Sequence, residues 1–176
     1  MHNRIIFLDI DGVVNTLQIS TKPFDTNRGR ISRDGFYYEL CNSSDKRVSN
    51  IQAVMWLNKL CVVTGAKIVI SSTWRYGSTL EEIKECLVNS GLLPEINLIG
   101  FTPDLRGNIN FCRGDEINQY LRENFCQNDK VSFIILDDDC DMGDLIDHLI
   151  QCDVNTGFGF NEYSDALEKF DFFEKL

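Results

Sequence analysis

Two aspartates spaced one residue apart, Asp9 and Asp11, come directly after a short apolar run near the start of the chain. On a strand, residues i and i+2 share a face, so the two carboxyl groups would project together. Gly12 would let the backbone turn sharply behind them. Two neighbouring acids resist joint ionisation unless a cation or a catalytic task explains them. A polar turn at a strand end would use the same residues, so the meaning of the pair depends on the residues at the ends of the other strands.

The elements that must position this pair are predicted from hydrophobic patterning. Apolar runs of strand length alternate with segments of helical periodicity, which indicates a parallel sheet with helices on both faces. We therefore predict an α/β, Rossmann-like fold, in which ligands bind at the carboxyl ends of the strands. The predicted strands are 4–8, 66–70, 97–101, 131–136 and a short one within 147–152. The predicted helices follow Ser49 and Thr79 and span 115–125 and 161–173.

The helix after Ser49 has apolar residues at helical spacing. They are Ile51, Val54, Met55, Leu57 and Leu60. Before it, residues 16–49 are rich in Ser, Thr, Asn, Gly and Asp, and 36–38 is the only clear strand candidate. We interpret 16–49 as a small flap or cap inserted into a single domain of residues 1–176.

Polar groups follow three of the predicted strands. Asp9 and Asp11 end the first, Ser71 and Ser72 follow the second, and the run 137–141 with its four aspartates follows the strand that ends at Leu136. Carboxylates and hydroxyls gathered at one edge suit a phosphate and a hard cation. Mg²⁺ takes an octahedron of oxygens, with one or two carboxylates, waters and a substrate oxygen. Asp9 with Asp137 or Asp138 would supply the carboxylates.

Composition limits the class of protein. The net charge of −10 argues against a broad electrostatic grip on nucleic acid. The seven cysteines form no Cys-x-x-Cys pair and read as reduced core thiols, which leads us to expect a cytoplasmic protein. No apolar run approaches the length of a membrane span, so we expect no membrane partner, and no obligate protein partner is evident.

Four motifs in this order resemble the haloacid dehalogenase-like (HAD) superfamily, and within it the branch associated with Swiss army knife RNA repair proteins. They are residues 7–15 (FLDIDGVVN), 70–75 (ISSTWR), 113–117 (RGDEI) and 135–142 (ILDDDCDM). The resemblance spans nearly the whole chain. It implies a HAD-like core and a phosphorylated substrate.

The resemblance implies a role for each motif residue. Asp9 would be the nucleophile that forms an aspartyl-phosphate. Asp11 would be the general acid and then the general base, and its main-chain carbonyl would ligate Mg²⁺. Ser71 would hydrogen-bond the transferring phosphoryl group, with Ser72 as the nearest alternative. Gly12 would lie against the substrate.

The third family motif is usually a lysine, and no lysine occurs between Lys84 and Lys130. The cation must then be Arg106, Arg113 or Arg122, and we select Arg113 because it precedes a predicted helix, as the motif requires. Arg75 would either meet the substrate or pack within the fold.

The acids of the fourth motif would bind the metal. Asp138 aligns with the ligand and Asp137 with its supporting partner, and an offset of one residue would exchange them. Asp141 would orient waters or the cation from a second layer.

The predicted activity is Mg²⁺-dependent hydrolysis of a phosphomonoester. The substrate would be a nucleic-acid terminal phosphate, a nucleotide or another small phosphomonoester. Phe36, Tyr37 and Tyr38 would line the entrance to stack on a base, or would pack the insertion onto the domain. A catalytically silent phosphate-binding module is the alternative from another class.

Overall fold

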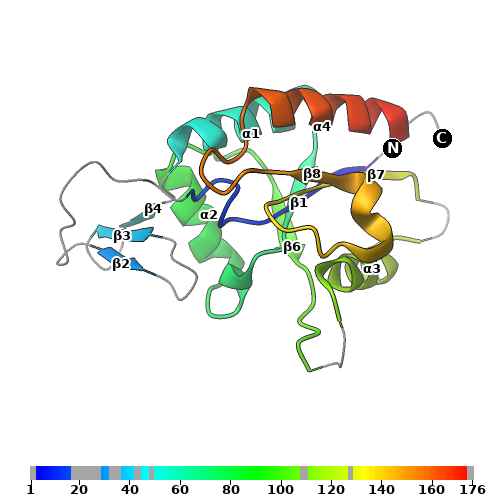
Figure 1. Ribbon diagram of the computed structural model, residues 1–176, viewed down its shortest axis with the longest axis horizontal. Helices are drawn as coiled ribbons and strands as arrows, with labels where there is room; N and C mark the ends of the chain where they lie inside the picture. Colours follow the sequence, from blue (N-terminus) through cyan, green and yellow to red (C-terminus); the bar gives the residue numbers. More distant parts are fainter. Residues whose placement is uncertain are drawn as a thin grey trace.

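The computed structural model describes residues 3–16, 29–31, 37–41, 45–47, 50–107, 111–126 and 129–173. Its centre is a five-stranded sheet of order β6-β5-β1-β7-β8, and every pair of neighbouring strands is parallel (Figure 1). The strands are β1 (Asn3–Leu8), β5 (Lys67–Ile70), β6 (Leu98–Phe101), β7 (Val131–Asp137) and β8 (Leu149–Gln151). The predicted parallel α/β sheet is confirmed.

The central strand β1 is buried on both faces. Ile6 and Leu8 pack into one hydrophobic cluster, and Ile5 and Phe7 into another. All four side chains are fully buried. A continuous apolar run, rather than an alternating one, is what a parallel strand covered by helices requires.

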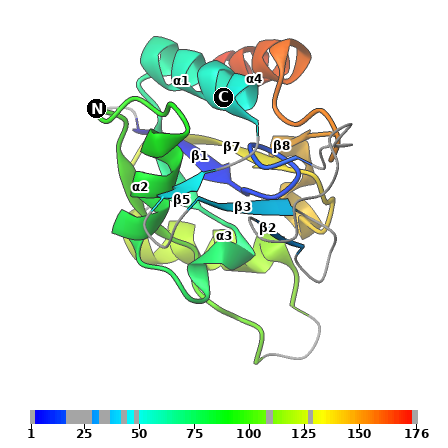
Figure 2. The same ribbon diagram turned by 90° about the vertical axis from the view of Figure 1, so that its left-hand side faces the viewer.

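Helices supply the other half of each cluster. α1 (Ile51–Thr64), α2 (Leu80–Asn89) and α4 (Phe160–Phe173) contribute to the cluster around Ile6. α3 (Arg113–Asn124) and the short helix η2 (Gly143–His148) contribute to the cluster around Phe7. Figure 2 shows α1 and α4 side by side over one face of the sheet, with α3 on the other. Helices on both faces were predicted, and this too is confirmed.

Helix α1 differs from its prediction at its start. Its N-cap is Asn50, whose side-chain oxygen accepts a hydrogen bond from the Ala53 amide at 3.0 Å, while Ser49 lies outside the described residues. Ile51 and Met55, two of the apolar residues from whose spacing the helix was predicted, are 56% and 63% exposed. They lie one turn apart on the same side of α1, at the edge of its apolar stripe. This stripe is wider than the part of the helix that the core covers.

The inserted segment holds three short strands where the sequence predicted one. β2 (Gly29–Ile31), β3 (Tyr37–Cys41) and β4 (Asp45–Arg47) form a separate antiparallel sheet, and β4 lies against α2. β2 and β4 are three residues long, too short for an alternating pattern to reveal them. Phe36 lies outside the described residues, and a role for this segment as a flap or cap stays a prediction.

Two further sequence expectations can be compared with the structure. Cys61, Cys86 and Cys152 are buried thiols, whereas Cys126 and Cys140 are exposed, so the cysteines are core residues only in part. Among the helices within the described ranges, none is both long and apolar enough to cross a membrane.

Candidate active site

Three neighbouring strand ends bring the predicted polar groups to one edge of the sheet. β1 lies between β5 and β7. Beyond the end of β1, the Asp9 amide donates to the Leu136 carbonyl at 2.9 Å, and beyond β5 the Ser71 amide donates to the Leu8 carbonyl at 2.8 Å. Asp137 is the last residue of β7. The three motifs therefore meet because their strands are in register.

Three carboxylates converge at this edge. Asp9, Asp137 and Asp138 each offer one oxygen, and these oxygens lie within 4.8 Å of one another. Asp9 and Asp137 are only 7% and 1% exposed. Within the described part of the chain, Asp137 Oδ2 is buried and has no hydrogen-bond partner. An all-oxygen donor set with an unsatisfied buried oxygen fits Mg²⁺, and both fourth-motif candidates lie in it.

The electrostatics of this cluster are those of acids crowded in a buried place. Burial raises the pKa of Asp9 to about 6, against the opposing effects of Arg113 and a hydrogen bond from Ser72. Burial, with the negative charge of Asp9, raises the pKa of Asp137 well above its usual range. Burial also raises the pKa of Asp138. A bound cation would favour the ionised carboxylates, which burial and their mutual repulsion disfavour.

Arg113, the first residue of α3, faces the acids. Its Nε lies 3.9 Å from Asp137 Oδ2, too far for a hydrogen bond but within ion-pair range. Burial lowers the pKa of Arg113, but the charges of Asp9 and Asp137 raise it by more, so the guanidinium stays charged. Its Nη1 is buried, and no described group accepts a hydrogen bond from it.

The start of α3 is fixed to the loop after β7. Asp141 Oδ2 accepts from the Arg113 amide at 3.2 Å, and its main-chain carbonyl accepts from the Gly114 amide at 3.3 Å. A Cβ on Gly114 would lie 2.0 Å from the Met142 carbonyl oxygen. Only glycine allows this approach, and Asp141 thus contacts the backbone that carries the cationic residue.

Two serines follow β5 with different surroundings. Ser71 is fully buried, and its Oγ has no hydrogen-bond partner among the described residues. The Ser72 side chain hydrogen-bonds the Asp9 carboxyl and accepts from the Trp74 amide at 3.4 Å. Ser71 therefore retains a hydroxyl for a ligand, while Ser72 is engaged with the predicted nucleophile.

Asp11 lies beside this cluster without being one of its three acids. Its Oδ1 accepts from Asn15 Nδ2 at 2.6 Å and its Oδ2 from Trp74 Nε1 at 3.0 Å. Gly12 has a φ of +78°, and a Cβ there would lie 2.3 Å from Cγ of Asp138. Gly12 thus packs against an acid of the cluster, and its predicted contact with substrate stays a prediction.

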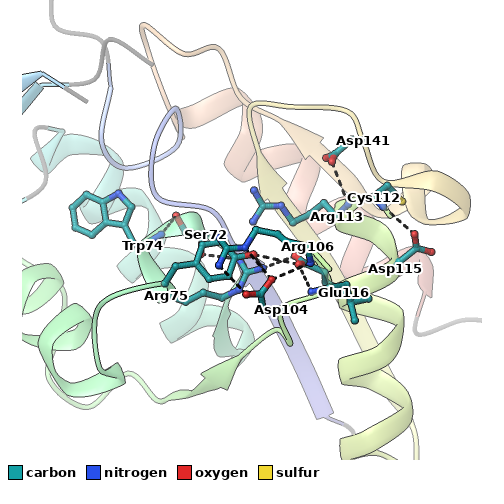
Figure 3. A network of polar contacts seen from close by, with 12 residues as sticks. Ser72, Trp74, Arg75, Asp104, Arg106, Cys112, Arg113, Asp115, Glu116 and Asp141 are labelled. Carbon is teal, nitrogen blue, oxygen red and sulfur yellow. Dashed lines mark hydrogen bonds and ion pairs between the residues drawn. The ribbon is translucent and has the colours of Figure 1, made fainter. Parts of the chain in front are cut away.

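Arg75, predicted either to meet substrate or to pack, is buried in a polar network (Figure 3). Its Nη2 donates to Glu116 Oε2 and to the Tyr76 hydroxyl, both at 2.5 Å, and its Nη1 donates to the Ser72 carbonyl at 2.7 Å. Its Nε is buried with no partner in the described part of the chain. The packing alternative fits this placement, because the side chain is only 3% exposed.

A known family matches the part of the chain that contains all four motifs. Residues 5–162 match the family described as the HAD domain in Swiss Army Knife RNA repair proteins. The chain belongs to this family. A structure described as a HAD superfamily (subfamily III A) hydrolase, from Legionella pneumophila, is similar over 98% of this chain and 86% of its own, at 14% identity and a TM-score of 0.42. No curated protein matches the chain.

As a member of this family, the domain is a HAD-type hydrolase. The third motif of the superfamily carries a cation, and the structure distinguishes the three arginines considered for it. Arg106 binds Asp104 at 2.8 Å on the surface and stacks over the Tyr76 ring at 3.3 Å from its centroid. Arg122 is exposed in the last turn of α3. Of the three arginines considered from the sequence, Arg113 is the one placed against the acids.

Sequence reasoning missed two polar contributors to the HAD domain. Glu116, the buried partner of Arg75, lies one turn before Tyr120 on the inward face of α3. A charged residue on a helix face that is predicted to be buried could have indicated that it has a buried partner. The contact of Trp74 with Asp11 spans 63 residues and had no local signal.

Proposed function

We propose that this HAD domain hydrolyses phosphomonoesters with Mg²⁺ as cofactor, using Asp9 as the nucleophile. The supporting observation is a set of buried polar atoms without hydrogen-bond partners among the described residues, at one edge of the sheet. They are Ser71 Oγ, Arg113 Nη1 and Asp137 Oδ2. A hydroxyl and a guanidinium suit phosphate oxygens, and an unsatisfied carboxylate oxygen suits a cation. Buried polar groups are normally satisfied, so three such atoms at one site favour a ligand there.

In the first step, a carboxylate oxygen of Asp9 forms a bond to phosphorus as the bond from phosphorus to the leaving oxygen breaks. Asp11 donates its proton to that oxygen, so the alcohol leaves neutral. Arg113 and Ser71 bind the equatorial phosphoryl oxygens and orient the group in line. The product is an aspartyl-phosphate on Asp9.

In the second step, water attacks phosphorus and gives a proton to the Asp11 carboxylate. The bond from phosphorus to the Asp9 oxygen breaks, which releases inorganic phosphate and restores both aspartates. Mg²⁺, which Asp9, Asp137 or Asp138 and the main-chain carbonyl of Asp11 would hold, supplies positive charge that offsets the phosphate and the crowded carboxylates.

Turnover of an aryl phosphate tests this proposal. We expect phosphate release that requires Mg²⁺, stops on chelation and falls by about 10³-fold or more in Asp9→Asn. Asp165→Asn, which removes an exposed carboxylate on α4, is the matched control and should retain full activity. Phosphate binding without turnover in the parent protein would instead support the silent binding module.

For the substrate, we propose the terminal phosphate of an RNA strand. The support is the family description, which names RNA repair proteins. The net charge of −10 gives the protein little general attraction for the nucleic-acid backbone, so this proposal has the strand end alone held at the site. Phosphate release from 3′-phosphorylated RNA, 5′-phosphorylated RNA and free nucleotides should therefore be compared. Equal and slow rates on all three would contradict an RNA-end substrate and favour another small phosphomonoester.

A further inference from the structure

The carboxyl group of Asp11 is held from two sides by different loops. Asn15 Nδ2 reaches one oxygen at 2.6 Å, and Trp74 Nε1 reaches the other at 3.0 Å. Asn15 belongs to the turn after β1, whereas Trp74 belongs to η1 (Thr73–Arg75) after β5. With a donor on each oxygen, rotation of the carboxyl group about its Cβ–Cγ bond is restrained.

Both donors are chemically suited to hold an acid without taking its proton. An indole N–H and an amide N–H₂ can donate hydrogen bonds but cannot accept one. A proton on Asp11 therefore cannot pass to either nitrogen. These two contacts therefore orient the carboxyl group without taking its proton.

The indole itself is fixed in place. The Trp74 ring packs against the large hydrophobic cluster, and its amide donates to Ser72 Oγ. The next residue, Arg75, is anchored by its buried ion pair with Glu116. On the other side, Asn15 is 1% exposed. Neither donor can move without disturbing buried neighbours.

We propose that Trp74 is a positioning residue that aims the Asp11 carboxyl group at the leaving oxygen of the substrate. The inference rests on the proposed phosphatase function, in which Asp11 protonates that oxygen. Proton transfer needs the acid within hydrogen-bond reach and correctly oriented. A displacement of about 1 Å in a reacting group can cost about 10²-fold in rate. Loss of the indole N–H would remove one of these two restraints and disfavour this alignment.

The leaving group provides a test that a merely structural role would not pass. An alkoxide needs a proton to depart, whereas p-nitrophenolate is stable enough to leave without one. We expect Trp74→Phe, which keeps an aromatic ring and loses the N–H, to lower kcat/KM on an alkyl phosphate by about 10- to 100-fold, because kcat/KM reports the steps up to departure of the leaving group. The kcat/KM on p-nitrophenyl phosphate should change far less. The kcat values are not compared, because kcat also contains the second step, in which Asp11 acts as the base on both substrates.

Matched variants make the result interpretable. Trp56→Phe, in α1 against Tyr163 and Phe160, should leave both substrates unaffected. Asn15→Leu removes the other donor and should reproduce the selective loss, so that the inference does not depend on one variant folding. Equal losses of kcat/KM on both substrates, or no loss on either, in Trp74→Phe and Asn15→Leu would overturn the proposed role of Trp74.

Asp11→Asn separates failure of this inference from failure of the proposed function. If Asp11 is the acid, Asp11→Asn should show the same selectivity between leaving groups in kcat/KM to a greater degree. Selectivity in Asp11→Asn without any in Trp74→Phe would overturn only the positioning role. Full activity of Asp11→Asn on the alkyl phosphate would overturn the assignment of Asp11 as the acid, and with it the proposed mechanism.

Discussion

Two arginines of the HAD domain, Arg75, which is buried, and Arg113, which is partly buried, have contrasting surroundings. Arg75 uses both terminal nitrogens in hydrogen bonds of 2.5 to 2.7 Å to Glu116, Tyr76 and the Ser72 carbonyl. Arg113 lies no closer than 3.9 Å to Asp137 in its ion pair, and its Nη1 has no hydrogen-bond partner within the described residues.

The difference distinguishes an arginine whose charge stabilises the fold from one whose charge is available to bind a ligand. A guanidinium with short bonds to a buried carboxylate has recovered most of what it lost on leaving water. A guanidinium with a buried, unpaired nitrogen has not, and an arriving anion would supply the missing bonds. Arg75 should therefore matter first for stability and Arg113 first for turnover.

The largest expected effect is on stability, from Arg75→Met. It leaves the Glu116 carboxylate buried without its cation, which typically costs about 3–5 kcal/mol. Denaturant unfolding followed by circular dichroism measures the change. The double variant Arg75→Met/Glu116→Leu removes both charges and should recover most of the lost free energy of unfolding. Failure of the double variant to recover stability would contradict a simple ion-pair role for Arg75.

Next in size is the effect of Arg113→Met on turnover. We expect kcat/KM for an aryl phosphate to fall by about 10²- to 10³-fold, because charge on the equatorial oxygens loses its partner. The free energy of unfolding should change far less than in Arg75→Met, since the Arg113 side chain has no short hydrogen bond to lose. Arg113→Lys should recover part of the activity as a point charge. A stable, fully active Arg113→Met would remove the distinction between the two arginines.

A smaller effect is expected from Mg²⁺ and pH acting on the acids that face Arg113. In the metal-free protein the pKa of Asp9 is raised from 3.8 to about 6, so the folded state disfavours its ionised form. The contribution of protonated Asp9 to the free energy of unfolding is therefore present below about pH 4 and is lost as the pH rises through about 6. Mg²⁺ needs the ionised acid, so its stabilisation should grow over the same range, to about 2.7 kcal/mol at 100 times its Kd.

Melting temperatures with and without Mg²⁺ across this range measure that effect, and Asp9→Asn should flatten the dependence. A stabilisation by Mg²⁺ that decreases as the pH rises would contradict binding at these carboxylates.

The smallest expected effect lies away from the site, at His148. Its ring stacks between Phe133 and Phe173 at centroid distances of 3.9 and 4.0 Å. Burial lowers its pKa below 6.5, so the unfolded chain binds a proton more readily than the folded one. Stability from this group is present above about pH 6.5 and is lost as the pH falls through the lower folded pKa, the opposite sign to Asp9. Comparison of His148→Phe with the parent protein by denaturant unfolding at each pH would isolate it.

The contrast between the arginines also shows what a sequence can predict. Asp9, Ser71 and Asp137 were found together because parallel strands present their carboxyl ends at one edge, and a buried strand is visible as an apolar run. Arg113 was selected from the motif order of the family and the absence of a lysine. The first inference needs only local patterns and one rule of topology, whereas the second also needs the resemblance to a family.

Long-range pairings could not be predicted in the same way. Arg75 and Glu116 are 41 residues apart, and no periodicity in either segment indicates that one neutralises the other. The exposure of Met55 depends on how much of α1 its neighbours cover, which its own spacing does not encode. Features set by partners distant in the sequence require the structure.

Strand β1 carries a consequence for measurement. It is hydrogen-bonded to β5 along one edge and to β7 along the other, and Ile5–Leu8 are fully buried. Amides in such a strand exchange with solvent only when the whole domain opens. Hydrogen–deuterium exchange at Ile5–Leu8 should therefore report global opening directly, next to the residue proposed to attack phosphorus. Substrate or Mg²⁺ bound at that edge would raise the free energy of this opening by RT ln(1 + [L]/Kd), so exchange measured at several ligand concentrations would report the affinity.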